Sequence, residues 1–225
     1  MAITSQNHKY QREHMKKLNL KWITVSIFVA LSTVSHAETK TTTVTHSSLT
    51  GIGPDDGVMR RDPSDIIKVD GLHYVWYSKG QITAKGNATG YDANVWYAIS
   101  SDGHNWTEKG IALDKGKPGS WEGASVFTPN ILVAEGKYWL FYTGTSKDYK
   151  KGFSPDSQIG IAVSDSADGP WVKLDTNPAL KKSTNKKDFD SHLIDDACLL
   201  VREGKYYFYY KGRQLGKSPA QTRVI

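Results

Sequence analysis

Apolar and aromatic residues in this chain recur in a unit that appears three times. In each unit an apolar run leads to an acidic residue and a glycine, and an aromatic run ending in glycine follows. The units are DPSDIIKVDGLHYVWYSKG from Asp62, TPNILVAEGKYWLFYTG from Thr128 and DDACLLVREGKYYFYYKG from Asp195. Two such runs around an acidic-Gly turn predict a β-hairpin. The hairpin glycines, Gly71, Gly136 and Gly204, are 65 and 68 residues apart.

A second unit recurs between the hairpins. It reads VWYAISSDGHNW at 95–106 and IGIAVSDSADGPW at 159–171, so that its two tryptophans are again 65 residues apart. Each copy is a strand, a Ser/Asp/Gly turn and a tryptophan, which gives each period about four short strands. No useful stretch after residue 37 has helical periodicity. Four evenly spaced strands per repeat predict an all-β fold, a β-propeller.

The number of repeats sets the predicted domain organisation. Residues 58–225 hold two full repeats and half of a third, after a short polar lead-in at 38–57. Propellers close with at least about four blades, so residues 58–225 are predicted to be a partial propeller without its carboxy-terminal blades. Residues 38–225 alone are then expected to be an open, poorly soluble and catalytically silent arc. The alternative is a small open β-sandwich of about ten strands.

The first 37 residues have the pattern of a secretory signal peptide. An apolar run, WITVSIFVALSTV at 22–34, follows Lys16, Lys17 and Lys21, and the small residues of Ser35-His36-Ala37 suit a cleavage site. The sequence therefore predicts export to a bacterial periplasm or the exterior, with no membrane association after cleavage. A short membrane anchor is the alternative.

Charge and cysteine content exclude several classes of protein. The net charge of +6 falls to +2 once residues 1–37, with five Lys/Arg and one Glu, are removed, so no nucleic-acid partner is expected. A single cysteine, Cys198, excludes an internal disulfide framework and a multi-cysteine zinc site. No cofactor or metal is predicted, because no set of ligands requires a cation in the central channel.

Two aspartates are the candidate catalytic residues. Asp62 lies nine residues before Gly71, and Asp195 lies nine residues before Gly204. The first strand of a propeller blade lines the central channel, so this register predicts that both carboxylates point into one cleft. Paired carboxylates suit glycoside hydrolysis, in which one activates water and the other donates a proton or tunes the first. The alternative is that each Asp caps a turn at a strand start.

Other residues are candidates for contacting an oligosaccharide, which offers hydroxyls to polar groups and C–H faces to aromatic rings. Asp196, Asn130 and His192 lie near the predicted strand starts. Arg213 and Gln214, with Lys211, end the third aromatic run, where a solvated loop is the alternative. Trp76, Trp96 and Trp121 are candidate stacking platforms, with sheet packing as the alternative.

Several segments together resemble glycoside hydrolase family 117. RRDPSDIIKVDGLHYVWYSKG resembles the first blade of the five-bladed propeller hydrolases of families 43 and 32. GSWEGASVFTPNILVAEGKYWLFYTG, HLIDDACLLVREGKYYFYYKGRQLGKSPAQT and YDANVWYAISSDGHNW resemble family 117 more specifically. That family includes the α-neoagarobiose hydrolases, which release terminal 3,6-anhydro-L-galactose from agar oligosaccharides. The resemblance covers roughly residues 57–222 and implies a five-bladed propeller.

The resemblance also implies roles for particular residues. Asp62 is implied as general base, and Asp195 or its neighbour Asp196 as the second carboxylate. Thr128 and His192 fall on stretches similar to the family's sugar-binding positions. The family's general acid would lie beyond Ile225. The family dimerises through a helical amino-terminal extension, whereas residues 38–57 are Thr-rich and lack helical periodicity, so a homodimer is left open.

Two other functions fit the same residues. One is a family 43-like propeller glycosidase that cleaves arabinose or galactose. The other is a carbohydrate-binding propeller without catalysis, which needs only aromatic platforms and hydroxyl-binding groups.

Overall fold

The computed structural model describes residues 42–81, 92–146, 156–216 and 223–224. The chain divides into two compact units, Met1–Val44 and Thr45–Ile225, and the fold described below belongs to the second. The predicted signal peptide at 1–37 lies outside the described residues. Within the described residues there is no helix, and hence none long and apolar enough to cross a membrane.

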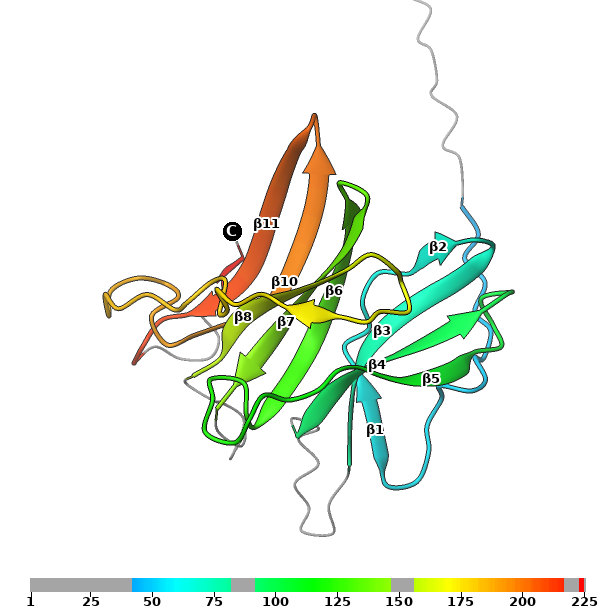
Figure 1. The fold of residues 1–225 in the computed structure, drawn as a ribbon, viewed down its shortest axis with the longest axis horizontal. Helices are drawn as coiled ribbons and strands as arrows, with labels where there is room; N and C mark the ends of the chain where they lie inside the picture. The colour runs from blue at the N-terminus through cyan, green and yellow to red at the C-terminus, as the bar shows by residue number, and fades with distance from the viewer. Residues whose placement is uncertain (1–41, 82–91, 147–155, 217–222, 225) are drawn as a thin grey trace, which may run out of the picture. The chain divides into compact units, whose positions relative to one another are not determined.

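Three antiparallel sheets make up the second unit (Figure 1). Blade 1 contains β1 (Val58–Arg61), β2 (Ile67–Val69), β3 (Leu72–Gln81), β4 (Ala93–Ser100) and β5 (Thr107–Leu113). Blade 2 contains β6 (Ser125–Ala134), β7 (Lys137–Thr145), β8 (Gln158–Ser164) and β9 (Val172–Lys173). Blade 3 contains β10 (Leu193–Arg202), β11 (Lys205–Arg213) and β12 (Arg223–Val224). The predicted all-β series of antiparallel blades is confirmed, and the two-sheet sandwich is wrong.

Each predicted hairpin has a tight turn because its sequence suits positive φ angles. The acidic residues Asp70, Glu135 and Glu203 have φ of 49°, 55° and 52°, and the glycine after each also has a positive φ. Two-residue turns with positive φ at both positions match the right-handed twist of the strands they join. The acidic-Gly pairs therefore fix the register of β2–β3, β6–β7 and β10–β11.

The strand after each hairpin turn, β3, β7 or β11, pairs with the strand that follows it, β4, β8 or β12, in one common register. The paired residues are Ser78 with Val95 in blade 1, Thr143 with Ile159 in blade 2 and Lys211 with Val224 in blade 3. Ser78, Thr143 and Lys211 are therefore equivalent positions, and we call them the register residues.

Blades 1 and 2 pack closely at the first interface. Trp76 is fully buried there and meets Trp171 edge-on, with ring centroids 5.8 Å apart. The hydroxyls of Tyr74 and Tyr97 donate across this interface to Asp168, at 3.1 and 3.3 Å. This interface forms the main apolar core, to which both blades contribute.

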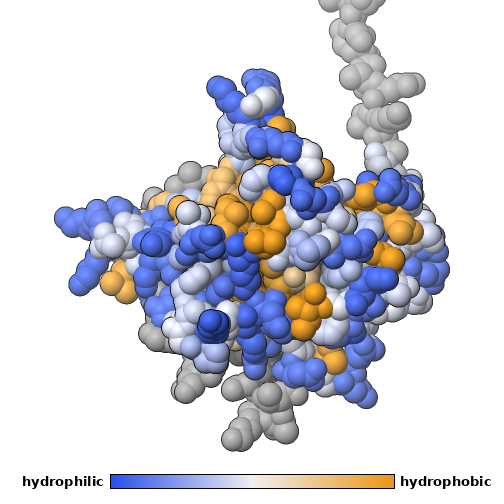
Figure 2. All heavy atoms as spheres, viewed as in Figure 1, coloured by the Kyte–Doolittle hydropathy of each residue, from blue (hydrophilic) through white to orange (hydrophobic). Residues whose placement is uncertain are grey.

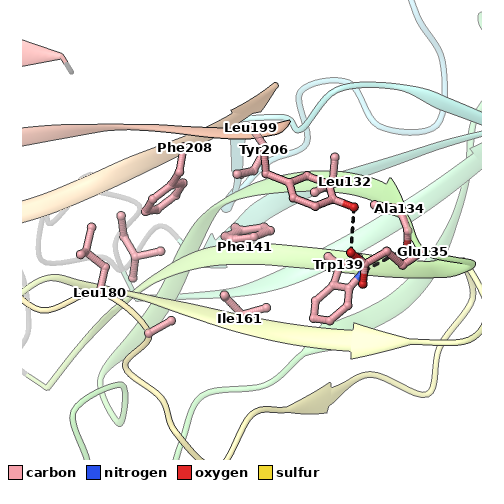
Figure 3. Close-up of a pocket in the computed structure, with 12 residues that line it drawn as sticks. Leu132, Ala134, Glu135, Trp139, Phe141, Ile161, Leu180, Leu199, Tyr206 and Phe208 are labelled. Atoms are coloured by element: carbon pink, nitrogen blue, oxygen red, sulfur yellow. Dashed lines mark hydrogen bonds between the residues drawn. The ribbon is translucent and has the colours of Figure 1, made fainter. Parts of the chain in front are cut away.

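Blades 2 and 3 meet at the second interface, where an apolar pocket of about 410 Å³ remains (Figure 3). Its walls include Trp139 and Phe141 on β7 and Leu199 and Phe208 on the β10–β11 hairpin. The Tyr206 hydroxyl donates to a Glu135 carboxylate oxygen at 2.9 Å, which links the two blades at the edge of the pocket. Figure 2, in the same view as Figure 1, shows apolar surface over the region of β8 and β10.

Candidate functional site

The strand segment before each hairpin turn, β1–β2, β6 or β10, is interrupted by a bulge whose first residue has a left-handed backbone. Asp62, Thr128 and Asp196 have φ of 50°, 46° and 55°. In β6 and β10 the ladder breaks at the same place, after Phe127 pairs with Thr143 and after Asp195 pairs with Lys211. In blade 1 the last ladder pair before the break is Arg61 with Ser78. Non-glycine residues with positive φ carry strain and are worth a functional explanation. We call these three the bulge residues.

This register corrects the equivalence that counting residues suggests. Asp62 is nine residues before its hairpin glycine, but Thr128 and Asp196 are eight residues before theirs. The blade 1 segment between β1 and β2 is therefore one residue longer than the matching bulges. The count from the glycine equates Asp62 with Asp195, whereas the backbone equates Asp62 with Asp196.

Hydrogen bonds from one blade to the next hold two of the bulge residues, Thr128 and Asp196. The buried Ser78 hydroxyl in blade 1 accepts the backbone N–H of Thr128 in blade 2 at 2.9 Å. The buried Thr143 hydroxyl in blade 2 accepts the backbone N–H of Asp196 in blade 3 at 3.3 Å. A bulge leaves a backbone group outside its own ladder. Here the register residue of the preceding blade supplies the partner.

The register residues also contact bulge side chains within their own blades. Ser78 donates a long hydrogen bond of 3.4 Å to Asp62, and the Thr143 and Thr128 hydroxyls are 2.5 Å apart. In blade 3 the Lys211 ammonium binds the Asp196 carboxylate. A continuous chain of polar contacts therefore connects Asp62 in blade 1 with Asp196 in blade 3.

Lys211 also pairs with Asp195, whose Oδ1 is 3.1 Å from Nζ. Asp195 is only 6% exposed, whereas Asp196 beside it is exposed. Burial, reinforced by the charge of Asp196, raises the pKa of Asp195 to about 6 although Lys211 opposes the change. Burial favours the uncharged acid, and a second carboxylate does the same. Asp195 and Asp196 thus have different environments within one pair.

Asp62 is held by its neighbour as well as by Ser78. The Nε of Arg61 donates to Asp62 Oδ2 at 2.6 Å, and both side chains are partly exposed. The carboxylate is oriented and open to solvent, as a group that acts on a bound water must be.

His192 and Arg213 lie at the start of β10 and the end of β11. The backbone N–H of His192 donates to the carbonyl of Arg213 at 2.8 Å. Burial lowers the pKa of His192, and the positive charges of Lys182 and Arg213 act in the same direction. The positive charge of Arg213 also acts on Asp195. The structure therefore brings these two candidates to the neighbourhood of the carboxylate pair.

Three other candidates have structural contacts. Trp76 is fully buried in the first interface, so its expected role as a sugar platform is wrong in this structure. Asn130 is buried, and its Oδ1 accepts the backbone N–H of Leu199 at 3.3 Å, which joins blades 2 and 3. Gln214 donates to the carbonyls of Lys186 and Lys187 and so tethers the loop before β10.

Sequence reasoning did not single out Ser78 and Thr143. Each register residue is the first polar residue after an aromatic run, directly following Tyr77, Tyr142 and Tyr210. This shared position was the available signal. The signal is weak, because a single Ser or Thr in an aromatic strand does not by itself indicate a catalytic or binding role.

The site offers carboxylate chemistry without an evident metal centre. In the part of the chain that the structure describes, no group of three or more His, Cys, Asp or Glu residues could hold a metal ion. The absence of a cofactor stays a prediction. The arrangement places one oriented, accessible carboxylate in blade 1 and a carboxylate pair with unequal environments in blade 3. Such an asymmetry suits acid–base chemistry on one substrate.

Comparison with known proteins gives concordant results. The sequence model of the glycosyl hydrolases of family 43 matches residues 93–224, which is more than half of the chain. An arabinoxylan arabinofuranohydrolase from Bacillus subtilis (strain 168) is 26% identical over 91% of this chain and 43% of its own length. An extracellular endo-α-(1→5)-L-arabinanase from Thermotoga petrophila is 30% identical over 49% of this chain and 22% of its own length.

The fold comparison adds a solved structure. Zg3597, a family 117 glycoside hydrolase from the marine bacterium Zobellia galactanivorans, aligns with a TM-score of 0.63 and 30% identity. The alignment covers 75% of this chain and 53% of Zg3597. The chain thus spans about half or less of the length of these three proteins.

Proposed function

The chain belongs to the glycosyl hydrolases of family 43, and we propose that it hydrolyses a glycosidic bond at the end of an oligosaccharide. One observation carries the proposal: two blades place aspartates, Asp62 and Asp196, on equivalent bulges joined by one chain of polar contacts. Glycoside hydrolases cleave with two carboxyl groups on either side of the scissile bond.

In the proposed mechanism Asp62 is the general base. It takes a proton from a water whose oxygen attacks the anomeric carbon, and the bond from that carbon to the leaving oxygen breaks. The leaving oxygen must receive a proton from an acid, so that one water is consumed for each bond cleaved. The Asp195–Asp196 pair with Lys211 is the second carboxylate centre.

The members of that pair divide the work by their environments. Asp195 is buried, and its pKa is raised to about 6, so it can hold a proton well above the pH range in which a carboxyl group in water is protonated. A carboxyl group that titrates near neutral pH can exchange a proton with a substrate oxygen or with a neighbouring group.

For the substrate we propose terminal 3,6-anhydro-L-galactose in oligosaccharides of the neoagarobiose type. The likeness to Zg3597, at 30% identity over 75% of this chain, supports this choice, together with the sequence resemblance to family 117. Arabinose-containing oligosaccharides are the second candidate, and the 26% identity to the arabinoxylan arabinofuranohydrolase favours them.

The test measures sugar release by the full-length protein. Neoagarobiose and arabinoxylan oligosaccharides are incubated in parallel, and free anhydrogalactose and arabinose are measured. We expect anhydrogalactose from the first; arabinose alone would shift the assignment to the second candidate. Release from neither substrate would contradict the proposed activity.

Asp62→Asn separates hydrolysis from mere binding. The amide keeps the shape of the carboxylate but cannot take a proton, so kcat should fall about 10²–10⁴-fold with little change in oligosaccharide affinity. Asp65→Asn is the matched control, because this exposed carboxylate lies three residues away and should leave kcat unchanged. Equal activity of Asp62→Asn and wild type would remove Asp62 from the mechanism.

A further inference from the structure

The side-chain hydroxyls of Ser78 and Thr143 each make two hydrogen bonds, and both bonds of each hydroxyl go to bulge residues. Ser78 Oγ accepts the N–H of Thr128 and donates to Asp62. Thr143 Oγ1 accepts the N–H of Asp196 and shares a hydrogen bond with Thr128 Oγ1. Both side chains are fully buried, so water cannot replace a lost partner without rearrangement. Each hydroxyl therefore contacts its own blade's bulge residue and the next blade's.

The bulge residues need such support because their backbones are strained. Left-handed φ angles at Asp62, Thr128 and Asp196 persist only where the surroundings hold them. The direction of each bulge side chain depends on that φ. A contact that fixes the bulge backbone therefore also fixes where the side chain points.

We propose that Ser78 and Thr143 are positioning residues, which align Asp62 in blade 1 with Asp196 in blade 3 by holding the intervening bulge at Thr128 from both sides. This inference rests on the proposed hydrolytic function for its kinetic consequence. Its structural consequence can be measured without any activity.

In blade 3, which carries the Asp195–Asp196 pair, the register residue is Lys211 instead of a hydroxyl residue. At the third register position the side chain is a cation, and it contacts the carboxylates of Asp195 and Asp196. The two hydroxyls hold backbone positions, whereas the ammonium at the end of the series forms ion pairs with both carboxylates. The series thus ends at the second carboxylate centre.

Ser125 provides a matched control for these hydroxyls. Its buried Oγ also joins blades 1 and 2, since it accepts the N–H of Ala93 at 3.0 Å and donates to the Ala93 carbonyl at 3.3 Å. It contacts no bulge residue in these hydrogen bonds. Loss of the Ser125 hydroxyl removes two inter-blade hydrogen bonds of the same kind and none to a bulge residue.

The first experiment measures amide hydrogen exchange by NMR in the whole protein. Ser78→Ala should accelerate exchange of the Thr128 N–H at least about tenfold, and Thr143→Val should do the same for the Asp196 N–H, because each amide loses its acceptor. Ser125→Ala should leave both amides protected. Unchanged protection of Thr128 in Ser78→Ala and of Asp196 in Thr143→Val would overturn the positioning role.

The second experiment measures sugar release by the same variants. Thr143→Val should lower kcat at least about tenfold with KM nearly unchanged, and Thr143→Ser should recover most of kcat because it restores the hydroxyl. Ser125→Ala should retain wild-type kcat. If Thr143→Ser loses as much kcat as Thr143→Val, the hydroxyl is not what matters. If Ser125→Ala loses as much kcat as Thr143→Val, the effect is merely structural. Either result would overturn the inference.

The two experiments also separate this inference from the proposed function. If the wild-type protein releases no sugar, the proposed function fails, and the exchange measurement still decides whether Ser78 and Thr143 hold the bulges. If sugar is released but the exchange and kinetic effects are absent, the positioning role fails and the proposed function stands.

Discussion

The two interfaces between blades have the same arrangement of bulge residues and register residues, but their apolar side chains pack differently. At the first, Trp76 is fully buried and Trp171 from the turn after β8 fits against it. At the second, the matching residue is Phe141, which lines a pocket of about 410 Å³ and contacts Phe208 at a centroid distance of 5.7 Å. Trp76 and Phe141 are equivalent, because each lies two residues before a register residue.

This difference separates two determinants of the fold. The bulges and the register residues repeat at both interfaces, so they align the blades whether or not the apolar space is filled. The filling comes from the turn at 165–171, whose Ala167, Asp168 and Trp171 pack on blade 1. Alignment and apolar filling are therefore separable, and substitutions can test each alone.

The largest expected effect comes from truncating the equivalent aromatic residues. Trp76→Ala should lower the free energy of unfolding by about 3–5 kcal/mol, because it removes a fully buried ring from a filled interface. Phe141→Ala should cost about 1–2 kcal/mol, because one side of its ring already faces the pocket. Urea unfolding of both variants measures the difference. Equal losses would show that the two interfaces are packed alike.

A pH effect should distinguish blade 3 from blade 2. The fold raises the pKa of Asp195 from 3.8 to about 6, so this group's stabilising contribution is complete below pH 4 and is lost as the pH rises through 6. The change corresponds to at most about 3 kcal/mol. The equivalent residue in blade 2 is Phe127, which does not titrate.

Asp195→Asn removes this dependence. Unfolding free energies at pH 4 and pH 7 should show the wild type losing stability relative to the variant as the pH rises. Asp196→Asn, at the exposed neighbour, is the control and should retain a smaller pH-dependent loss, because burial still raises the pKa of Asp195 when the charge of Asp196 is removed. Parallel pH profiles for wild type and Asp195→Asn would contradict the assignment of this effect to Asp195.

The smallest effect comes from adding volume at each interface. Ala134→Ile places extra carbon atoms at the wall of the pocket and should stabilise the protein by about 0.5–1 kcal/mol. Ala162→Ile makes the same change in the filled first interface, where Ala162 is fully buried, and should cost about 1–3 kcal/mol. Thermal melting compares the pair. Destabilisation by both substitutions would mean that the pocket wall cannot accept a larger side chain.

The repeating hairpins could be predicted from the sequence because their determinants are local. Acidic-Gly turns and alternating aromatic runs specify β2–β3, β6–β7 and β10–β11 without reference to the rest of the chain. The equivalence of Asp62 with Asp196 could not be predicted in this way. A bulge adds residues to one strand without a mark in the apolar pattern, so counting from a glycine misplaces it by one residue.

The candidate site could be predicted where the residue type itself indicates the chemistry. It could not be predicted where packing between blades determines whether a side chain is exposed. The repeat register predicts Asp62 and Asp195 as paired carboxylates, and the family resemblance adds Asp196 as the alternative second carboxylate. The structure connects all three through one chain of polar contacts. Trp76 was chosen as an exposed ring, but a neighbouring blade covers it, and a repeat pattern does not reveal which strand face the next repeat buries.

The inter-blade bond to each bulge has a consequence for how such repeats diverge. The Thr143 hydroxyl accepts a hydrogen bond from the backbone N–H of Asp196, and the Ser78 hydroxyl accepts one from that of Thr128. Every residue except proline has a backbone N–H. The bulge position therefore accepts any residue that tolerates a left-handed backbone, here threonine in blade 2 and aspartate in blade 3. After duplication of a blade, the side chain at the bulge position can therefore change during evolution while the hydrogen bond that orients it is kept.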